Sequence, residues 1–205
     1  MIYQKERLNK INPVVKCLCE IALSKYKKDC IIVEGKRTVE RQLELYGKGR
    51  SIVECMKYMD YKKAVKYSKP TETQVTWTTN SRHLTGLAVD VVPFYNNKIQ
   101  WVLDPDLIRI MEMHGFESGS RWKKQDIPHY QIDLPKPLRK TISSYNTTPQ
   151  LTRCIQSQLV KKGYIIAIDG VFGEQTKQAV KDFKCEHGLY FTPRVTRKAI
   201  KLLFL

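Results

Sequence analysis

The sequence predicts an α+β domain, a small antiparallel sheet with flanking helices, followed by a second unit of three short helices. Two observations lead to this prediction. Up to about residue 134, segments with helical spacing of apolar residues alternate with short continuous apolar runs that are typical of buried strands. From about residue 150 onward, apolar residues recur with helical spacing. A polar, proline-containing stretch separates the two parts, so we predict a first domain over residues 1–137, a linker over 138–149 and a second domain over 150–205.

The elements of the first domain follow from apolar spacing and from capping residues. In chain order, the pattern predicts a helix over 11–26, a strand over 30–33, a helix over 38–46, a strand over 88–92, a helix over 106–114 and a strand over 130–132. Thr38 can cap the second of these helices. Asp104 followed by Pro105 is an N-cap and first-turn signal for the third. His114, at the end of that helix beside Gly115, is interpreted as a structural residue.

The second unit is predicted to contain three amphipathic helices, from about Leu151 to Gly163, from Glu174 to Cys185 and from about Thr192 to Leu203. A tight turn is expected at Asp169–Gly173, where two glycines flank a short apolar pair. About 55 residues make a small core, but three packed helices can suffice.

Three side chains of the first domain, His83, Asp90 and His129, are of the types that hold a catalytic zinc. Two imidazoles and one carboxylate leave the fourth tetrahedral position to water, whose pKa the metal lowers to roughly 7. Histidines are more often structural or exposed, but Asp90 interrupts an apolar strand, where an unpaired carboxylate is costly and favours a cation. Asp126, three residues before His129, is placed to take and return a proton in the same pocket. The pattern indicates a metal hydrolase with one zinc per chain.

At these residues the sequence resembles the zinc peptidases that cut bacterial wall peptides. The resemblance rests on Ser-x-His-x3-Gly-x-Ala-x-Asp at 81–90 and on Asp-x-Pro-His at 126–129. The family includes D-Ala-D-Ala carboxypeptidases and the L-alanyl-D-glutamate endopeptidases of bacteriophage endolysins. Residues 33–42 and 46–51 are similar to the first motif of the same family. The resemblance therefore covers about residues 30 to 135.

The resemblance implies roles for the matched residues: zinc ligands His83, Asp90 and His129, general base Asp126, and substrate-contacting residues Gln42 and Ser81. It also implies that Arg37 faces the scissile carbonyl, where a fixed guanidinium can stabilise the developing oxyanion. Without the resemblance, Arg37 is equally well explained as a surface arginine at the start of a charged helix.

Two segments depart from the pattern of the family. In Ser118–Trp122 the family commonly has an acidic residue before the tryptophan, where this chain has Arg121. The stretch from Ile52 to Thr79 is longer than a short loop, and its apolar and aromatic residues have near-helical spacing. We expect this stretch to form an additional helix packed on the core, the alternative being a helix over the cleft.

The second unit resembles the peptidoglycan-binding domain of many wall hydrolases. The resemblance rests on Ile155-Gln156-x2-Leu159, on Gly163-Tyr164 and on the run from Asp169 to Phe183. It implies a three-helix fold. Most motif positions are helix caps and core, so the candidate wall-binding residues are a smaller set, namely Tyr164, Asp169, Phe172 and Thr176.

The chain is strongly basic, with 36 Lys and Arg against 20 Asp and Glu and a net charge of +16. Such a charge favours anionic partners, of which nucleic acid and an acidic cell envelope are the two main classes. No stripe of basic residues interleaved with aromatics and no nucleic-acid-binding motif is found. Bacterial peptidoglycan is therefore the expected partner.

The six cysteines, Cys17, Cys19, Cys30, Cys55, Cys154 and Cys185, form no Cys-x2-Cys pair, and several lie in apolar stripes. We expect buried free thiols, typical of a protein made in a reducing compartment. The N-terminal segment has no apolar core of a signal peptide, and no run of 18 apolar residues occurs, so stable membrane insertion is not expected.

Together these features predict a phage endolysin, a zinc-dependent L-alanyl-D-glutamate endopeptidase that hydrolyses peptidoglycan stem peptides to lyse the host cell. The alternatives are a D-Ala-D-Ala carboxypeptidase, a wall-binding protein with an inactive peptidase domain, and a nucleic-acid-binding protein. Asp126 together with Arg37 argues against an inactive domain, which has no reason to keep them. We expect a monomer located in the cytoplasm of the infected host, which reaches the wall after a separate membrane-permeabilising protein has acted.

Overall fold

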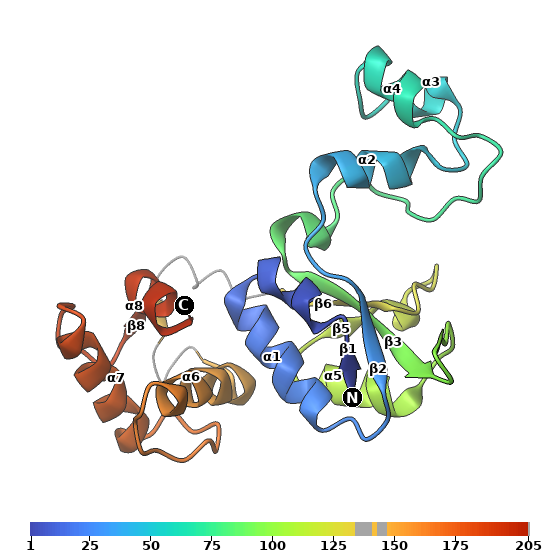
Figure 1. Ribbon diagram of the computed structural model, residues 1–205. Coiled ribbons are helices and arrows are strands. Elements are labelled where there is room, and N and C mark those ends of the chain that lie inside the picture. Colours follow the sequence, from blue (N-terminus) through green and yellow to red (C-terminus); the bar gives the residue numbers. More distant parts are fainter. Residues whose placement is uncertain (134–140, 143–146, 205) are drawn as a thin grey trace.

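The first domain is built around a mixed sheet (Figure 1). The computed structural model describes residues 1–133, 141–142 and 147–204. Within them the sheet has six strands in the order β1-β2-β3-β6-β5, with β4 paired to the end of β3. The strands are β1 (Ile2–Tyr3), β2 (Cys30–Glu34), β3 (Ala88–Tyr95), β4 (Lys98–Ile99), β5 (Glu117–Ser118) and β6 (His129–Gln131). The predicted antiparallel sheet is confirmed, with one parallel pair, β1 and β2, at its edge.

Two helices pack on each other and on this sheet to form the core. They are α1 (Pro13–Ser24) and α5 (Pro105–Met113). The predicted cap Asp104 starts α5 by accepting a hydrogen bond from the Leu107 N–H at 2.9 Å. Val89 and Val91 of β3 belong to the same core. Because side chains alternate along a strand, Asp90 between them faces the opposite side of the sheet.

A helical unit projects beyond the end of the sheet, at the top of Figure 1. It contains α2 (Val39–Gly47), α3 (Ile52–Cys55) and α4 (Tyr61–Tyr67). The expected single core-packing helix after Ile52 is wrong, because Asp60 caps a new helix and divides the segment in two. Cys55 and Ala64 are buried inside the unit, whereas Val53 and Tyr61 are exposed. The helices α3 and α4 therefore pack on each other and on α2.

Three helices form the second domain, as predicted. They are α6 (Pro149–Lys161), α7 (Glu174–Glu186) and α8 (Arg197–Phe204). The α8 helix begins later than expected, because the Lys184 ammonium holds the preceding loop by donating to the carbonyls of Thr192 and Arg194 at 3.1 Å. Most of the predicted linker lies outside the described residues. Of its described residues, β7 (Thr141–Ile142) pairs with β8 (Val195–Thr196), and Thr148 caps α6, which begins at Pro149 inside the predicted linker.

The two domains are joined through α1 and α6, which pack side by side. Cys17 of α1 and Cys154 of α6 form a disulfide with a Cα–Cα distance of 5.9 Å. The expectation of six buried free thiols is therefore wrong for this pair, and Cys185 is exposed. Apolar stripes indicate which cysteines are buried, but pairing depends on the packing of two helices 137 residues apart in sequence. None of the helices in the described part of the chain has the length and apolar character needed to cross a bilayer.

Candidate active site

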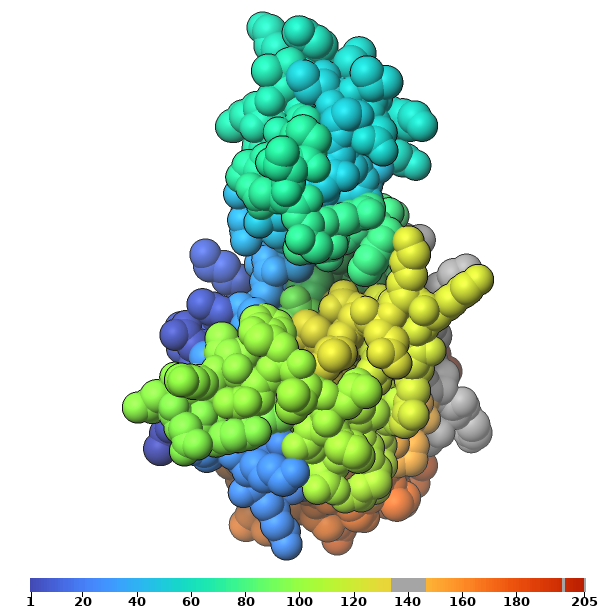
Figure 2. All heavy atoms as spheres, turned by 90° about the vertical axis from the view of Figure 1, so that its right-hand side faces the viewer, coloured from blue at the N-terminus to red at the C-terminus, as the bar shows by residue number. Residues whose placement is uncertain are grey.

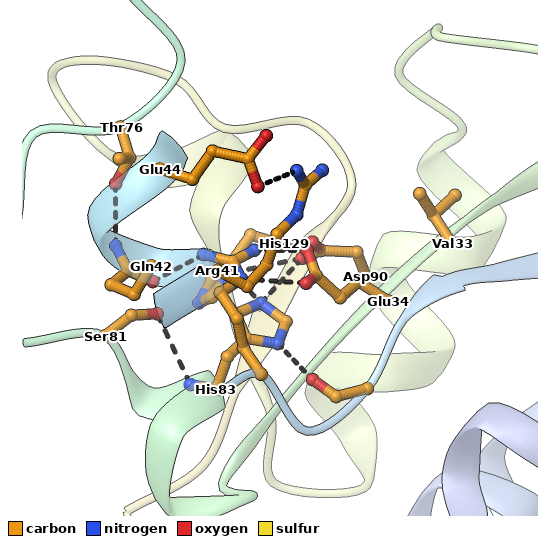
Figure 3. Close-up of polar contacts among 12 residues, drawn as sticks. Val33, Glu34, Arg41, Gln42, Glu44, Thr76, Ser81, His83, Asp90 and His129 are labelled. Atoms are coloured by element: carbon orange, nitrogen blue, oxygen red, sulfur yellow. Dashed lines mark hydrogen bonds and ion pairs between the residues drawn. The ribbon is translucent and has the colours of Figure 1, made fainter. Parts of the chain in front are cut away.

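Three buried side chains of the first domain converge at the middle of β3 (Figure 3). Asp90 of β3 pairs directly with His129 of β6, and His83 comes from the short 3-10 helix η2 (Arg82–Thr85) just before β3. His83 Nε2 lies 3.1 Å from Asp90 Oδ1 and 3.2 Å from His129 Nδ1, and this last atom lies 3.1 Å from Asp90 Oδ1. The structure therefore brings the three predicted metal ligands into one cluster.

Local backbone chemistry determines where the His83 ring points. Ser81 caps η2 by accepting a hydrogen bond from the His83 N–H at 3.3 Å, and Gly86 ends it with a φ of +70°. A side chain at Gly86 would also clash with the backbone of Asn12. His83 Nδ1 lies 2.6 Å from the carbonyl oxygen of Gly35. Because a carbonyl only accepts, Nδ1 carries the hydrogen and Nε2 presents its lone pair to the cluster.

A chain of polar side chains orients His129 in the same way. His129 Nε2 lies 3.3 Å from Gln131 Oε1, and Gln131 Nε2 donates to Glu117 at 2.8 Å. The other Glu117 oxygen accepts from the Trp122 indole at 2.6 Å, and the Trp122 ring packs against the His129 ring at a tilt of 47°, with centroids 5.1 Å apart. The Gln131 oxygen accepts the hydrogen of Nε2, so Nδ1 of His129 turns its lone pair to the cluster.

The cluster fits a divalent metal. Two imidazole lone pairs and a carboxylate oxygen face one another, and such a set needs a cation between them. Burial by itself would raise the pKa of Asp90 and lower that of His129, but their mutual contacts outweigh burial, so the Asp90 pKa lies below its ordinary value and the His129 pKa above. Zinc bonds of about 2.0–2.1 Å in tetrahedral geometry place the donor atoms about 3.3 Å apart. The observed separations of 3.1 to 3.2 Å are close to that value.

Arg37 lies beside the cluster, held by two neighbours. Its Nε and Nη2 donate to the two carboxylate oxygens of Glu34 at 2.9 and 2.5 Å, and its Nη1 donates to Gln42 Oε1 at 2.7 Å. Gln42 is fully buried, and its amide also donates to the Thr78 carbonyl at 2.6 Å. In this structure Gln42 is not among the residues that line the cleft and is connected to it by its hydrogen bond with Arg37, whereas Ser81 lines the cleft. The predicted substrate contacts of both residues remain predictions.

Asp126 lines the same cleft and lies outside the three-ligand cluster. Its N–H donates to the Gly119 carbonyl at 3.0 Å, and its carbonyl accepts from the His129 N–H at 3.2 Å. Burial raises the pKa of the Asp126 carboxyl, and the nearby Asp90 carboxylate raises it further. A carboxylate with a raised pKa beside a metal site is suited to accept and return a proton. Its role as the base remains a prediction.

These groups lie at the floor of a cleft of about 630 Å³. Figure 2 shows the helical unit α2 to α4 standing above the body of the first domain, with the segment around residues 120–130, in yellow, beside the junction. Residues 75–78, in the segment that follows α4, form one wall of the cleft, and Trp77, Trp101 and Trp122 line it. The cleft is therefore open, with aromatic walls and a polar, charged floor.

The segment that departs from the family pattern builds part of this site. A side chain at Gly119 would clash with the Asp126 carbonyl, so the turn needs glycine there. Arg121 pairs with Glu112 of α5 at 3.0 Å and is absent from the cleft lining, so the departure at this position does not alter the floor of the cleft.

The candidate wall-binding residues of the second domain serve its fold in this structure. Phe172 and Thr176 are buried. One oxygen of Asp169 accepts from the Val171 N–H at 2.8 Å, and the Tyr164 hydroxyl donates to Glu186 at 2.6 Å. Contact of these residues with the wall remains a prediction.

Sequence reasoning did not single out four residues that support the site, namely Glu34, Gly35, Glu117 and Gln131. One signal was present, because Gln131 follows His129 by two positions and therefore lies on the same face of its strand. The Gly35 carbonyl and the Glu117 carboxylate reach the site through tertiary contacts, which no local pattern reveals.

Comparison with known proteins covers both domains. Residues 75–132 match a family model described as D-alanyl-D-alanine carboxypeptidase, and residues 149–203 match one described as putative peptidoglycan binding domain. Among solved structures, the chain is similar to the L-Ala D-Glu endopeptidase ChiX of Serratia marcescens, with 24% sequence identity, 65% of this chain and 90% of that chain covered, and a TM-score of 0.45. No curated protein gives a significant match.

The first family match includes the three clustered side chains and Asp126, and the second spans the helices α6 to α8. The chain therefore joins a peptidase, in which residues 75–132 match the D-alanyl-D-alanine carboxypeptidase model, to a C-terminal domain in which residues 149–203 match the peptidoglycan-binding model.

Proposed function

We propose that this peptidase is a zinc-dependent endopeptidase that hydrolyses the L-alanyl-D-glutamate bond of peptidoglycan stem peptides. The observation that carries the proposal is the cluster of His83, Asp90 and His129, which has three donor atoms directed at one point and lies in an open cleft beside Asp126 and Arg37. Three protein ligands leave one position for water or substrate, as in catalytic rather than structural zinc sites.

In the proposed hydrolysis, the zinc ligands, Asp126 and Arg37 have different roles. Zinc bound by the cluster would supply a water of lowered pKa and polarise the substrate carbonyl. Asp126 accepts the proton of the attacking water and returns it to the amine that leaves. Arg37 has five N–H donors, of which three are used by Glu34 and Gln42, so two remain for the developing oxyanion.

The choice of bond rests on the sequence. The first motif, residues 33–42 and 46–51, together with the wall-binding domain, resembles endolysins that cut between L-Ala and D-Glu. Cleavage of D-Ala-D-Ala is the second candidate, and the description of the matching family model favours it. The two reactions give different products, because the first creates a new amino terminus on D-Glu and the second releases free D-Ala.

Digestion of purified peptidoglycan by the zinc-loaded full chain, followed by mass spectrometry of the released fragments, tests the proposal. Fragments that begin with D-Glu are the expected result, and release of D-Ala alone would move the assignment to the second candidate. Retention of zinc without either product would identify a wall-binding protein with an inactive peptidase domain.

We further propose that the enzyme is a phage endolysin, a monomer that accumulates in the cytoplasm of the infected bacterium. Access to the wall then depends on a separate membrane-permeabilising protein. Expression in a host bacterium tests this role: lysis is expected after permeabilisation of the membrane and not before. Lysis that occurs without permeabilisation would contradict it.

The second domain is proposed to hold the enzyme on the wall, which raises its effective concentration at an insoluble substrate. A chain with a net charge of +16 could also adhere to an acidic envelope without a specific site. Binding of the full chain to purified peptidoglycan should persist near 0.5 M salt, where the Debye length falls to roughly 4 Å. Loss of all binding at that salt would leave only an electrostatic anchor.

A further inference from the structure

Glu34, at the end of β2, makes the closest contacts to Arg37 in the cleft. Its two carboxylate oxygens accept from Arg37 Nε and Nη2 at 2.9 and 2.5 Å, which is a bidentate pair. Only 9% of the Arg37 side chain and 25% of the Glu34 side chain are exposed, so solvent screens this pair less than it screens a surface pair. We infer that Glu34 is a positioning residue that holds Arg37 for the proposed peptidase reaction.

An irregularity in the sheet places Glu34 on the side of the site. Ile32 pairs with Val91 and Glu34 pairs with Asp90, so Val33 is an extra residue in β2, a β-bulge. Without the bulge, Glu34 would pair with Val89 and share its face, which is the core side of the sheet. The bulge instead aligns Glu34, Asp90 and His129 in one row across three neighbouring strands.

The pair also limits how closely Arg37 approaches a candidate metal ligand. Arg37 Nη2 forms a longer ion pair with Asp90 Oδ2, at 3.7 Å, than with Glu34, at 2.5 Å. Glu34 accepts one hydrogen bond from that same Nη2 and one from the adjacent Nε, and this two-point contact fixes the plane of the guanidinium. Without Glu34, the guanidinium would be free to close on Asp90 and compete with the metal for its carboxylate. Gln42 contacts only Nη1 and cannot prevent this rotation.

The contacts of Glu34 favour a positioning role. Among the described residues, it is not a member of the group of side chains that could share a metal ion. Both its oxygens accept hydrogen bonds from Arg37, so its carboxylate is engaged by the guanidinium. We expect it to act through Arg37.

The inference rests on the proposed function and is tested on the full chain by zinc affinity and by kcat at saturating zinc on a soluble stem peptide. Glu34→Ala should weaken zinc binding by about 10-fold, in the range of other residues that orient metal ligands. It should also lower kcat by about 10- to 100-fold with a smaller change in KM. Glu34→Gln, which keeps the shape and one acceptor, should recover part of both losses. Glu44→Ala is the matched control, because Glu44 pairs with Arg41 at the same i, i+3 spacing at 2.8 Å on the exposed side of α2.

A double-mutant cycle separates positioning from a general structural effect. If Glu34 acts through Arg37, the double variant should have the same kcat as Arg37→Ala alone. Its zinc affinity should be at the wild-type level, because the guanidinium that competes for Asp90 in Glu34→Ala is absent. Losses that simply add in the double variant, or a Glu34→Ala variant with wild-type zinc affinity and kcat, would overturn the inference. Failure of the wild-type chain to cut the peptide would instead count against the proposed function, while the zinc titrations would still test whether Glu34 protects Asp90.

Discussion

The two domains use buried polar side chains in different ways. In the second domain, the Gln156 amide donates to Asp169, to the Val171 carbonyl and to Thr176, and its oxygen accepts from the Gly170 N–H, so all its bonds stay within the fold. In the first domain, His83 and His129 each use one ring nitrogen for a hydrogen bond within the fold, and the other ring nitrogen of each faces a common centre. Buried polar residues whose hydrogen bonds are all made to one another indicate a structural role. Lone pairs that converge on one point with no hydrogen between them indicate a site for a cation.

The largest effect is expected from removing a converging histidine. His83→Ala or His129→Ala should abolish zinc binding and lower kcat by about 1,000-fold or more, because the nucleophilic water depends on the metal. Asp126→Ala should keep the zinc and lower kcat by about 10²- to 10⁴-fold, the contribution of general acid–base catalysis. Metal analysis and kinetics on a stem peptide measure both. His187→Ala, in the second domain, is the control that should retain metal and rate; an empty site in Asp126→Ala would show that Asp126 is a ligand.

The junction between the domains offers the next largest effect. The Cys17–Cys154 disulfide closes a loop of 137 residues, and its loss should lower the free energy of unfolding by about 2–5 kcal/mol. Cys154→Ser should therefore lower Tm while leaving kcat on a soluble stem peptide unchanged, since the bond lies away from the cleft. Titration of thiols in denaturant should give four before reduction and six after it. Six thiols in the protein as purified under oxidising conditions would contradict the pairing.

The hydrogen bonds of Gln156 in the second domain predict that removing its side chain lowers the stability of the protein and leaves zinc binding in the first domain unchanged. Gln156→Ala removes bonds to the turn after α6 and to α7, and it should cost about 2–3 kcal/mol of unfolding free energy. Denaturant unfolding measures the change. Zinc affinity should stay at the wild-type value, and a drop in zinc affinity would show that the two domains are coupled more closely than their separate networks indicate.

The smallest expected effect is a dependence of stability on pH at Asp104. Burial raises the pKa of this carboxyl, but hydrogen bonds from Lys28, from the Leu107 N–H and from Tyr26 outweigh it, so the pKa lies below its ordinary value. A lowered pKa means that the stabilisation is present above the unfolded-state pKa and is lost as the pH falls through the folded-state pKa. Asp104→Asn should therefore reduce the difference in Tm between pH 6 and pH 2.5. An unchanged difference would show that Asp104 does not titrate in this window.

Much of the candidate site could be predicted because its residues form short motifs. His83 and Asp90 are seven positions apart, and one turn of η2 with the start of β3 is enough to bring them together. The caps at Thr38 and Asp104 were equally local, since each bonds an N–H three residues later. The division after Ile52 was missed, because near-helical apolar spacing outweighed the capping signal of Asp60.

The sequence by itself predicted a sheet-containing part followed by a helical part, the chemical types of the candidate metal ligands and the helices that carry clear caps, because these depend on residues within a few turns of one another. Only the tertiary structure decided which cysteines pair, which carbonyl orients His83 and that a bulge at Val33 turns Glu34 toward Arg37. Each of these results depends on segments far apart in the chain, whose approach follows from the packing of the whole core.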